Sequence, residues 1–147
     1  MKLRPRDVIS YQGQDYVVEG IVTYKLGGKV HRLARAVDGA AVVWVEPLMT
    51  DADDRLVFFH EVNDLPLVTP PPATISYKGQ SYLPRLSGTA AVDVDGVIAE
   101  REAGTCEVWR YRGPGDIFLQ IELWPSGTVV LAGESVHKDM IEVLPAP

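Results

Sequence analysis

The sequence predicts an all-β protein made of two related antiparallel β-units, of the meander, small-barrel or sandwich type, packed together. Three observations support this fold class. Segments rich in β-branched and aromatic residues recur along the chain, and such segments favour strands. Short glycine-containing turns separate them, and no long segment has helical periodicity. A motif of eight residues occurs twice, which indicates an internal duplication.

The repeated motif predicts the opening hairpin of each unit. A glycine two residues after a tyrosine is typical of a tight turn between two strands. We expect the two tyrosines of each copy to pair across the hairpin, Tyr11 with Tyr16 and Tyr77 with Tyr82. Six of the eight positions are identical in the two copies, which are ISYQGQDY (residues 9–16) and ISYKGQSY (residues 75–82).

The first unit, residues 1–69, is expected to form an antiparallel meander. Gly27-Gly28 and Asp38-Gly39 are turn dipeptides, because glycine accepts a positive φ. The expected strands after the opening turn are Asp15–Leu26, Val30–Val37, Ala41–Leu48 and Arg55–Val62.

The second unit, residues 70–147, follows a stiff linker at residues 68–74 with three consecutive prolines. A single helical turn is expected at Glu134–Met140. The expected strands after the second copy of the motif are Thr89–Val94, Val97–Glu102, Thr105–Arg112, Asp116–Trp124 and Thr128–Gly133.

The two units are expected to bury each other in one compact, pseudo-symmetric domain. A β-unit of about 70 residues has only a marginal core by itself. When the offset between the halves is allowed to grow, Gly20 aligns with Gly88 and Glu46 with Glu122.

Composition limits the classes of function. The net charge of −6 argues against a nucleic-acid binder that depends on bulk electrostatics. Cys106 is the only cysteine, so no intramolecular disulfide forms and a reducing compartment is expected. The longest apolar run, Ala40–Val45, is far shorter than the roughly 20 residues of a membrane helix. The N-terminus has no secretory signal pattern. We therefore expect a soluble cytoplasmic protein without a membrane span.

No motif indicates catalysis, a metal or a cofactor. The histidines, His31, His60 and His137, have no partner at a metal-ligand spacing. Cys106 lacks the basic neighbours that stabilise a thiolate. We expect no catalytic residue, no metal ligand and no cofactor.

The aligned glutamates are the main candidate binding residues. Strand alternation places Gln120, Glu122 and Trp124 on one face, and Trp44 and Glu46 occupy the equivalent places in the first unit. If the units pack around a pseudo-two-fold axis, the two carboxylates converge in an aromatic-lined cleft, where paired carboxylates serve as acid and base. The alternative is a pair of surface glutamates beside amphipathic tryptophans.

Four arginines on neighbouring hairpins form a second candidate surface. They are Arg32, Arg35, Arg110 and Arg112. Arginine near tyrosine or tryptophan stacks on bases or binds acidic partners. The alternative is a solvated hairpin face, balanced by nearby glutamates.

The chain resembles the bacterial family called domain of unknown function 4178. The resemblance covers almost the whole chain and depends on RPRDVISYQGQDYVVEGIVTY, VVWVEPL, SYLPRLSGTAAV and FLQIELWPSGTVVLAGESVHKDMIEVL. Members often have an aromatic-rich, acidic stretch where this chain has KVHRLARAV. The resemblance implies no established activity, and it suggests a bacterial cytoplasmic protein whose family is associated with membrane-stress or polyamine-synthase-like genes.

Three functions follow as hypotheses. The first is a non-enzymatic interaction module that binds an unidentified protein partner through strand edges and exposed Trp44, Trp109 and Trp124. The second is a small-molecule binder or minor enzyme with a cleft between the halves. A polyamine-like cation is then the first ligand to test, because an acidic, aromatic cleft suits a polycation. The third is an RNA-binding small barrel that uses the four arginines.

Overall fold

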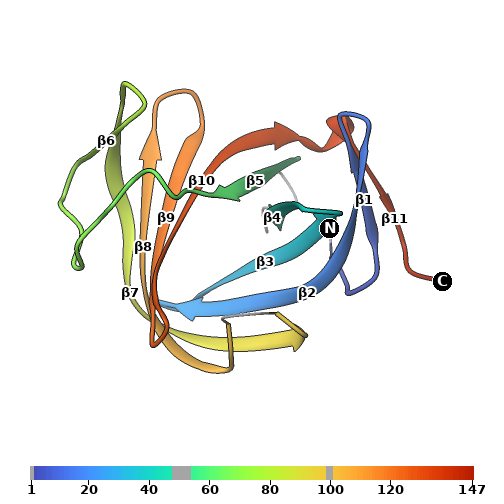
Figure 1. The fold of residues 1–147 in the computed structure, drawn as a ribbon, viewed down its shortest axis with the longest axis horizontal. Coiled ribbons are helices and arrows are strands. Elements are labelled where there is room, and N and C mark those ends of the chain that lie inside the picture. The colour runs from blue at the N-terminus through green and yellow to red at the C-terminus, as the bar shows by residue number, and fades with distance from the viewer. Residues whose placement is uncertain (1, 48–53, 99–100) are drawn as a thin grey trace.

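The chain closes into an antiparallel β-barrel of eight strands (Figure 1). The computed structural model describes residues 2–47, 54–98 and 101–147. This part of the chain contains eleven strands and one 3₁₀ helix, η1 (Lys138–Met140). The strands are β1 (Val8–Tyr11), β2 (Gln14–Leu26), β3 (Lys29–Asp38), β4 (Ala41–Pro47), β5 (Arg55–Glu61), β6 (Ile75–Tyr77), β7 (Gln80–Gly96), β8 (Gly104–Gly113), β9 (Ile117–Trp124), β10 (Gly127–His137) and β11 (Ile141–Leu144).

The barrel closes through two long-range strand pairs. Neighbouring strands follow the order β2-β3-β4-β5-β10-β9-β8-β7, and β7 pairs back with β2. The closing pair runs from Gly20 opposite Gly96 to Lys25 opposite Ala91. Strands β1 and β11 continue the sheet beyond β2, and β6 continues it beyond β7. The prediction of an all-β fold is confirmed, and its architecture is a barrel.

The two copies of the repeated motif fold as the same hairpin. The turn residues have positive φ angles, 49° and 77° at Gln12 and Gly13, and 48° and 75° at Lys78 and Gly79. Such a two-residue turn matches the right-handed twist of its strands. It also sets the register.

This register contradicts the predicted tyrosine pairs. Ile9 lies opposite Tyr16 and Ile75 opposite Tyr82, while the first tyrosine of each motif lies opposite a glutamine. In a two-residue turn, the two residues that flank the turn lie opposite each other. The two tyrosines of one copy therefore do not face each other.

The two halves of the chain have the same strand order. We call β1–β5 the first half and β6–β10 the second half. Consecutive strands pair in each half, and the halves meet at β5–β10 and β2–β7. Each second strand has a register shift two residues beyond the motif's last tyrosine, at Val18 in β2 and at Pro84 in β7.

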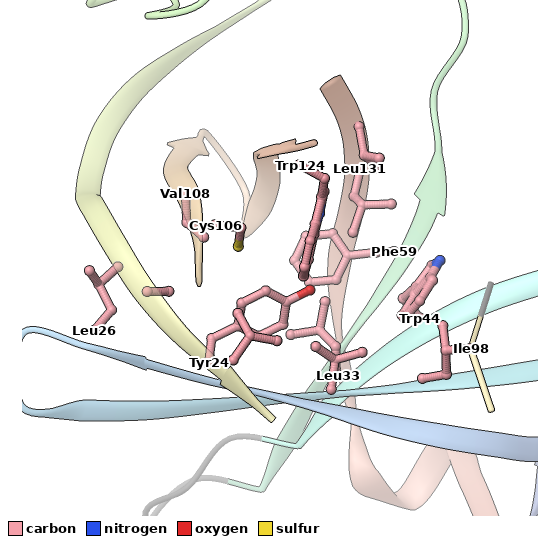
Figure 2. Close-up of a cluster of buried hydrophobic side chains, with 14 of the residues drawn as sticks. Tyr24, Leu26, Leu33, Trp44, Phe59, Ile98, Cys106, Val108, Trp124 and Leu131 are labelled. Atoms are coloured by element: carbon pink, nitrogen blue, oxygen red, sulfur yellow. The ribbon is translucent and has the colours of Figure 1, made fainter. Parts of the chain in front are cut away.

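Three apolar clusters stabilise the barrel. One fills the interior and includes Tyr24, Leu33, Trp44, Phe59 and Trp124 (Figure 2). The second lies on the outer face of the first half, under β1 and β11. The third lies on the outer face of the second half, under β6 and the segment that follows β5. The motif residues Ile9, Tyr16, Ile75 and Tyr82 belong to these two outer clusters.

Two predicted elements are wrong, and one strand was not predicted. Strand β7 ends at Gly96, and the described residues of the predicted strand Val97–Glu102 form no strand, while its residues 99 and 100 lie outside the described ranges. The chain turns inward there, and Ile98 packs against Gly20, where a Cβ atom would lie 2.7 Å from Ile98 Cγ1. The predicted helical turn reduces to η1, because β10 runs to His137. Strand β11, which pairs with β1, was missed.

No helix in the described ranges is long and apolar enough to cross a membrane.

Candidate functional site

Charged side chains lie inside the barrel, among the apolar cluster. Alternation along β4 and β9 directs Trp44, Glu46, Gln120, Glu122 and Trp124 to the interior. The exposed fractions of Glu46 and Glu122 are 2% and 0%. The five candidate binding residues are therefore brought together, but in a filled barrel interior and not in a cleft between separate units.

The expected exposure of the tryptophans is wrong. Trp44 and Trp124 are buried in the interior cluster, and Trp109 is half-buried against the outer cluster of the second half. Closure of the sheet turns one face of each barrel strand away from solvent, and alternation alone cannot distinguish an inward face from an outward one.

Glu122 on β9 is held by three uncharged donors. Its Oε1 accepts hydrogen bonds from Tyr24 Oη at 3.0 Å and from Trp124 Nε1 at 2.8 Å. Its Oε2 accepts a hydrogen bond from Gln120 Nε2 at 2.8 Å. Burial, followed by the charge of Glu122, raises the pKa of Tyr24 well above its ordinary value, so the phenol remains a donor.

Glu46 on β4 is paired with a cation from the barrel wall. Arg110 on β8 donates from Nη1 to Oε1 at 2.7 Å, and His31 Nδ1 donates to Oε2 at 3.1 Å. Burial by itself raises the pKa of Glu46, but the charge and hydrogen bond of Arg110, with the His31 contact, outweigh it. The pKa of Glu46 therefore lies below its ordinary value.

A polar chain connects the two glutamates. Arg110 also donates from Nε to Gln120 Oε1 at 3.0 Å and makes a second, short contact with the same oxygen from Nη2. Gln120 in turn donates to Glu122. The carboxylates thus belong to one buried network, as buried polar groups require.

Arg101 supplies the charge that opposes Glu122. It lies in the connection between β7 and β8, and its side chain is only 4% exposed. Its guanidinium carbon is 4.2 Å from the ring centroid of Trp44 and 5.8 Å from that of Trp124. Its Nε is 3.5 Å from Glu122 Oε1. Among the described residues, Nε and Nη2 of Arg101 have no hydrogen-bond partner.

Arg101 is the interior residue that sequence reasoning missed. The local sequence Glu-Arg-Glu is typical of a solvated segment, and the stretch was predicted as a strand. Tyr24 had a usable signal, because it alternates with Val22 and Leu26, which are also buried. No local signal places Arg101 inside.

The four arginines do not form one patch. Arg110 lies in the interior network, Arg35 pairs with Glu19, and Arg112 pairs with Asp116. Arg32, the fourth, is half-buried on β3 and makes no salt bridge within the described part of the chain. Strand alternation directs Arg110 into the barrel, so the surface proposed for RNA is not assembled from these residues.

The arrangement gives little support to acid–base or thiol chemistry. Each glutamate has a nearby guanidinium, and the lowered pKa of Glu46 is the opposite of a carboxyl that shares a proton. Burial, followed by the charge of Glu122, raises the pKa of the Cys106 thiol to about 12. In the described ranges, no three His, Cys, Asp or Glu side chains are placed to hold a metal ion.

Comparison with known proteins identifies one family. A family model for a domain of unknown function (DUF4178) matches residues 4–138, nearly the whole chain, and confirms the resemblance found in the sequence motifs. No curated protein and no solved structure gives a match.

Proposed function

We propose that this chain, which belongs to the family described as a domain of unknown function (DUF4178), is a non-enzymatic binding protein for a small organic cation. The proposed site is the barrel interior at Glu122, between Trp44 and Trp124. One observation carries the proposal: the chain's own guanidinium, that of Arg101, occupies this position.

The chemistry of the site suits a cation. A carboxylate beside tryptophan faces is the combination that recognises organic cations, because the ring quadrupole and the charge attract the same group. Three hydrogen bonds orient Glu122 without neutralising it. A preorganised carboxylate in a buried site needs a cation to balance its charge, and Arg101 fills that place in this structure.

Calorimetric titration of the wild-type chain tests this proposal. The probes are methylguanidinium, methylammonium, putrescine and spermidine, each at millimolar concentration. We expect at least one cation to bind with one-to-one stoichiometry, and Glu122→Gln to abolish this binding because the variant removes the charge. Glu142→Gln on β11, an exposed glutamate, is the matched control and is expected to bind as the wild type does. If none of the probes binds to the wild type or to Arg101→Ala, the proposal is wrong.

A second candidate function is a protein-interaction module, and a surface groove favours it. The groove has a volume of about 660 Å³ and lies beside the edge strand β6, which lacks a strand partner on one side among the described strands. Its lining includes His60, Glu61, Asp64, Tyr77 and Lys78. Exposed edges and grooves are common docking surfaces.

Chemical crosslinking in the native host, with Asp64→Lys as the disrupting variant, tests this candidate. If Asp64→Lys gives the same crosslinked products as the wild type, the groove is not the docking surface.

We also propose that the two halves arose by duplication. The support is the equal strand order, the equal turn conformations and the equivalent register shifts in β2 and β7. The bacterial cytoplasm as the location and a role in membrane stress stay predictions.

A further inference from the structure

We infer that the ligand binds through a guanidinium group that replaces the Arg101 guanidinium, so that Arg101 acts as a built-in competitor for the site. This inference deepens the cation-binding function proposed above and depends on it. It names the chemical class of the ligand and a residue that lowers the protein's affinity for it.

The two buried arginines, Arg110 and Arg101, differ in the hydrogen bonds that they make. Arg110 lies on a barrel strand and makes directed hydrogen bonds to Glu46 and Gln120. Arg101 lies outside the strands, is buried more completely, and has two guanidinium nitrogens without a hydrogen-bond partner among the described residues. Buried donors in native proteins are almost always satisfied. Among the described residues, Arg101 is therefore the less well satisfied of the two buried arginines.

The hydrogen bonds that Glu122 already accepts explain why Arg101 donates none to it. The carboxylate oxygen nearest to it, Glu122 Oε1, already accepts two hydrogen bonds, which use its two lone pairs. Glu122 Oε2 accepts only one hydrogen bond among the described residues, from Gln120. Arg101 approaches the saturated oxygen. A ligand that is not tethered to the chain can turn toward Oε2 and gain the hydrogen bond that Arg101 lacks.

The aromatic surroundings of the site favour a guanidinium over an ammonium. Arg101 lies over the Trp44 ring, where a planar cation stacks with its faces covered by aromatic carbon. A guanidinium is more weakly hydrated than an ammonium, so its transfer into a buried site costs less. An ammonium is compact and strongly hydrated, so its transfer from water into this buried site costs more than that of a guanidinium.

Arg101 can leave Glu122 only if another cation takes its place. Arg101 belongs to no strand pair, so its side chain supports none of the described pairings of the barrel. Departure without a replacement leaves Glu122 buried without a cation, which is unfavourable. Exchange of one guanidinium for another keeps the charge of Glu122 balanced. Arg101 therefore lowers the apparent affinity by the fraction of time that it occupies the site.

The test compares wild type and Arg101→Ala in calorimetric titrations with methylguanidinium and methylammonium. We expect methylguanidinium to bind the variant at least about tenfold more tightly, because the competitor is gone. Methylammonium is expected to bind either protein more weakly than methylguanidinium does. Arg112→Ala is the matched control: Arg112 also lies over an aromatic ring, that of Phe118, but at an exposed position. This control is expected to bind as the wild type does.

The outcomes separate this inference from the function on which it depends. Equal affinity of wild type and Arg101→Ala, with binding still abolished by Glu122→Gln, overturns the competitor role and leaves the cation-binding function intact. Tighter binding of methylammonium than of methylguanidinium overturns the ligand class. Binding to neither protein overturns both proposals.

A measurement on the wild type keeps the inference testable if Arg101→Ala does not fold. The Nε–H resonances of Arg101 and Arg110 are followed by NMR during titration with methylguanidinium. We expect the Arg101 resonance to change and the Arg110 resonance to stay, because only Arg101 leaves. A change confined to Arg110 contradicts the inference.

Discussion

The two halves of the barrel place a glutamate at the same point of the fourth strand of each half, but they neutralise it in different ways. Glu46 lies opposite Val57, and Glu122 lies opposite Val129. Glu46 pairs with Arg110, which belongs to the barrel wall and makes further hydrogen bonds. Glu122 faces Arg101, which belongs to a connection and, among the described residues, makes no hydrogen bond from Nε or Nη2. The difference supports the proposal that the Glu46 pair stabilises the fold while the cation at Glu122 exchanges with a ligand.

The largest expected effect is that of Arg110→Ala. The substitution leaves Glu46 buried and without its guanidinium, and the loss of one partner of a buried ion pair costs about 3–5 kcal/mol. Urea unfolding measures this change in the free energy of unfolding. In the comparison variant, Arg101→Ala, the free energy of unfolding is expected to fall by less, because Glu122 keeps its three uncharged hydrogen-bond donors. An equal or larger loss in Arg101→Ala contradicts the division between the two arginines.

The next effect is that of Gly20→Ala, at the first-half register shift. A Cβ atom at this position would lie 2.7 Å from Asp95 O and 2.7 Å from Ile98 Cγ1. Overpacking of this kind costs roughly 1–3 kcal/mol, and the closing β2–β7 pair has to move. Thermal unfolding measures the loss. Gly13→Ala has no such clash, although its positive φ disfavours alanine, so it separates backbone strain from overpacking. Wild-type stability in Gly20→Ala would falsify the close contact at this point.

Much of the fold was predictable because its signals are local. Turn glycines and β-branched segments predict most of the strands, and alternation along β4 and β9 groups Trp44, Glu46, Gln120, Glu122 and Trp124 on matching faces. The direction of those faces depends on the β2–β7 and β5–β10 pairs, which join distant segments. No local pattern predicts such pairs, so the interior was interpreted as a cleft. Arg101 was missed for the same reason, because only barrel closure surrounds it.

The third expected effect compares the two copies of the repeated hairpin. Ile9 and Ile75 are 0% and 2% exposed, and each lies opposite a buried tyrosine. Ile→Val in a packed core costs about 0.5–1.5 kcal/mol, so Ile9→Val and Ile75→Val are expected to cost similar amounts. Chemical unfolding of both variants, with Val17→Ala as an exposed control, measures this. A large cost in one copy and none in the other would show that the hairpins stabilise the halves unequally.

The last prediction concerns pH, and it probes the Glu46 side of the comparison. The pKa of Glu46 is lower in the folded protein than its ordinary value of 4.5, because Arg110 and His31 together outweigh burial. A lowered folded pKa contributes stability above the unfolded pKa, and this contribution disappears as the pH falls through the folded pKa. The stability difference between wild type and Glu46→Gln should therefore be constant near neutrality and should shift against the wild type below 4.5. Urea unfolding of both proteins across this range measures the shift. The same comparison in an Arg110→Ala background, if it still folds, should weaken or reverse this pH dependence, because burial raises the pKa of Glu46 and only His31 then opposes it. A pH dependence of the same sign and size that survives there would assign the effect to His31 and would weaken the contrast between the two halves.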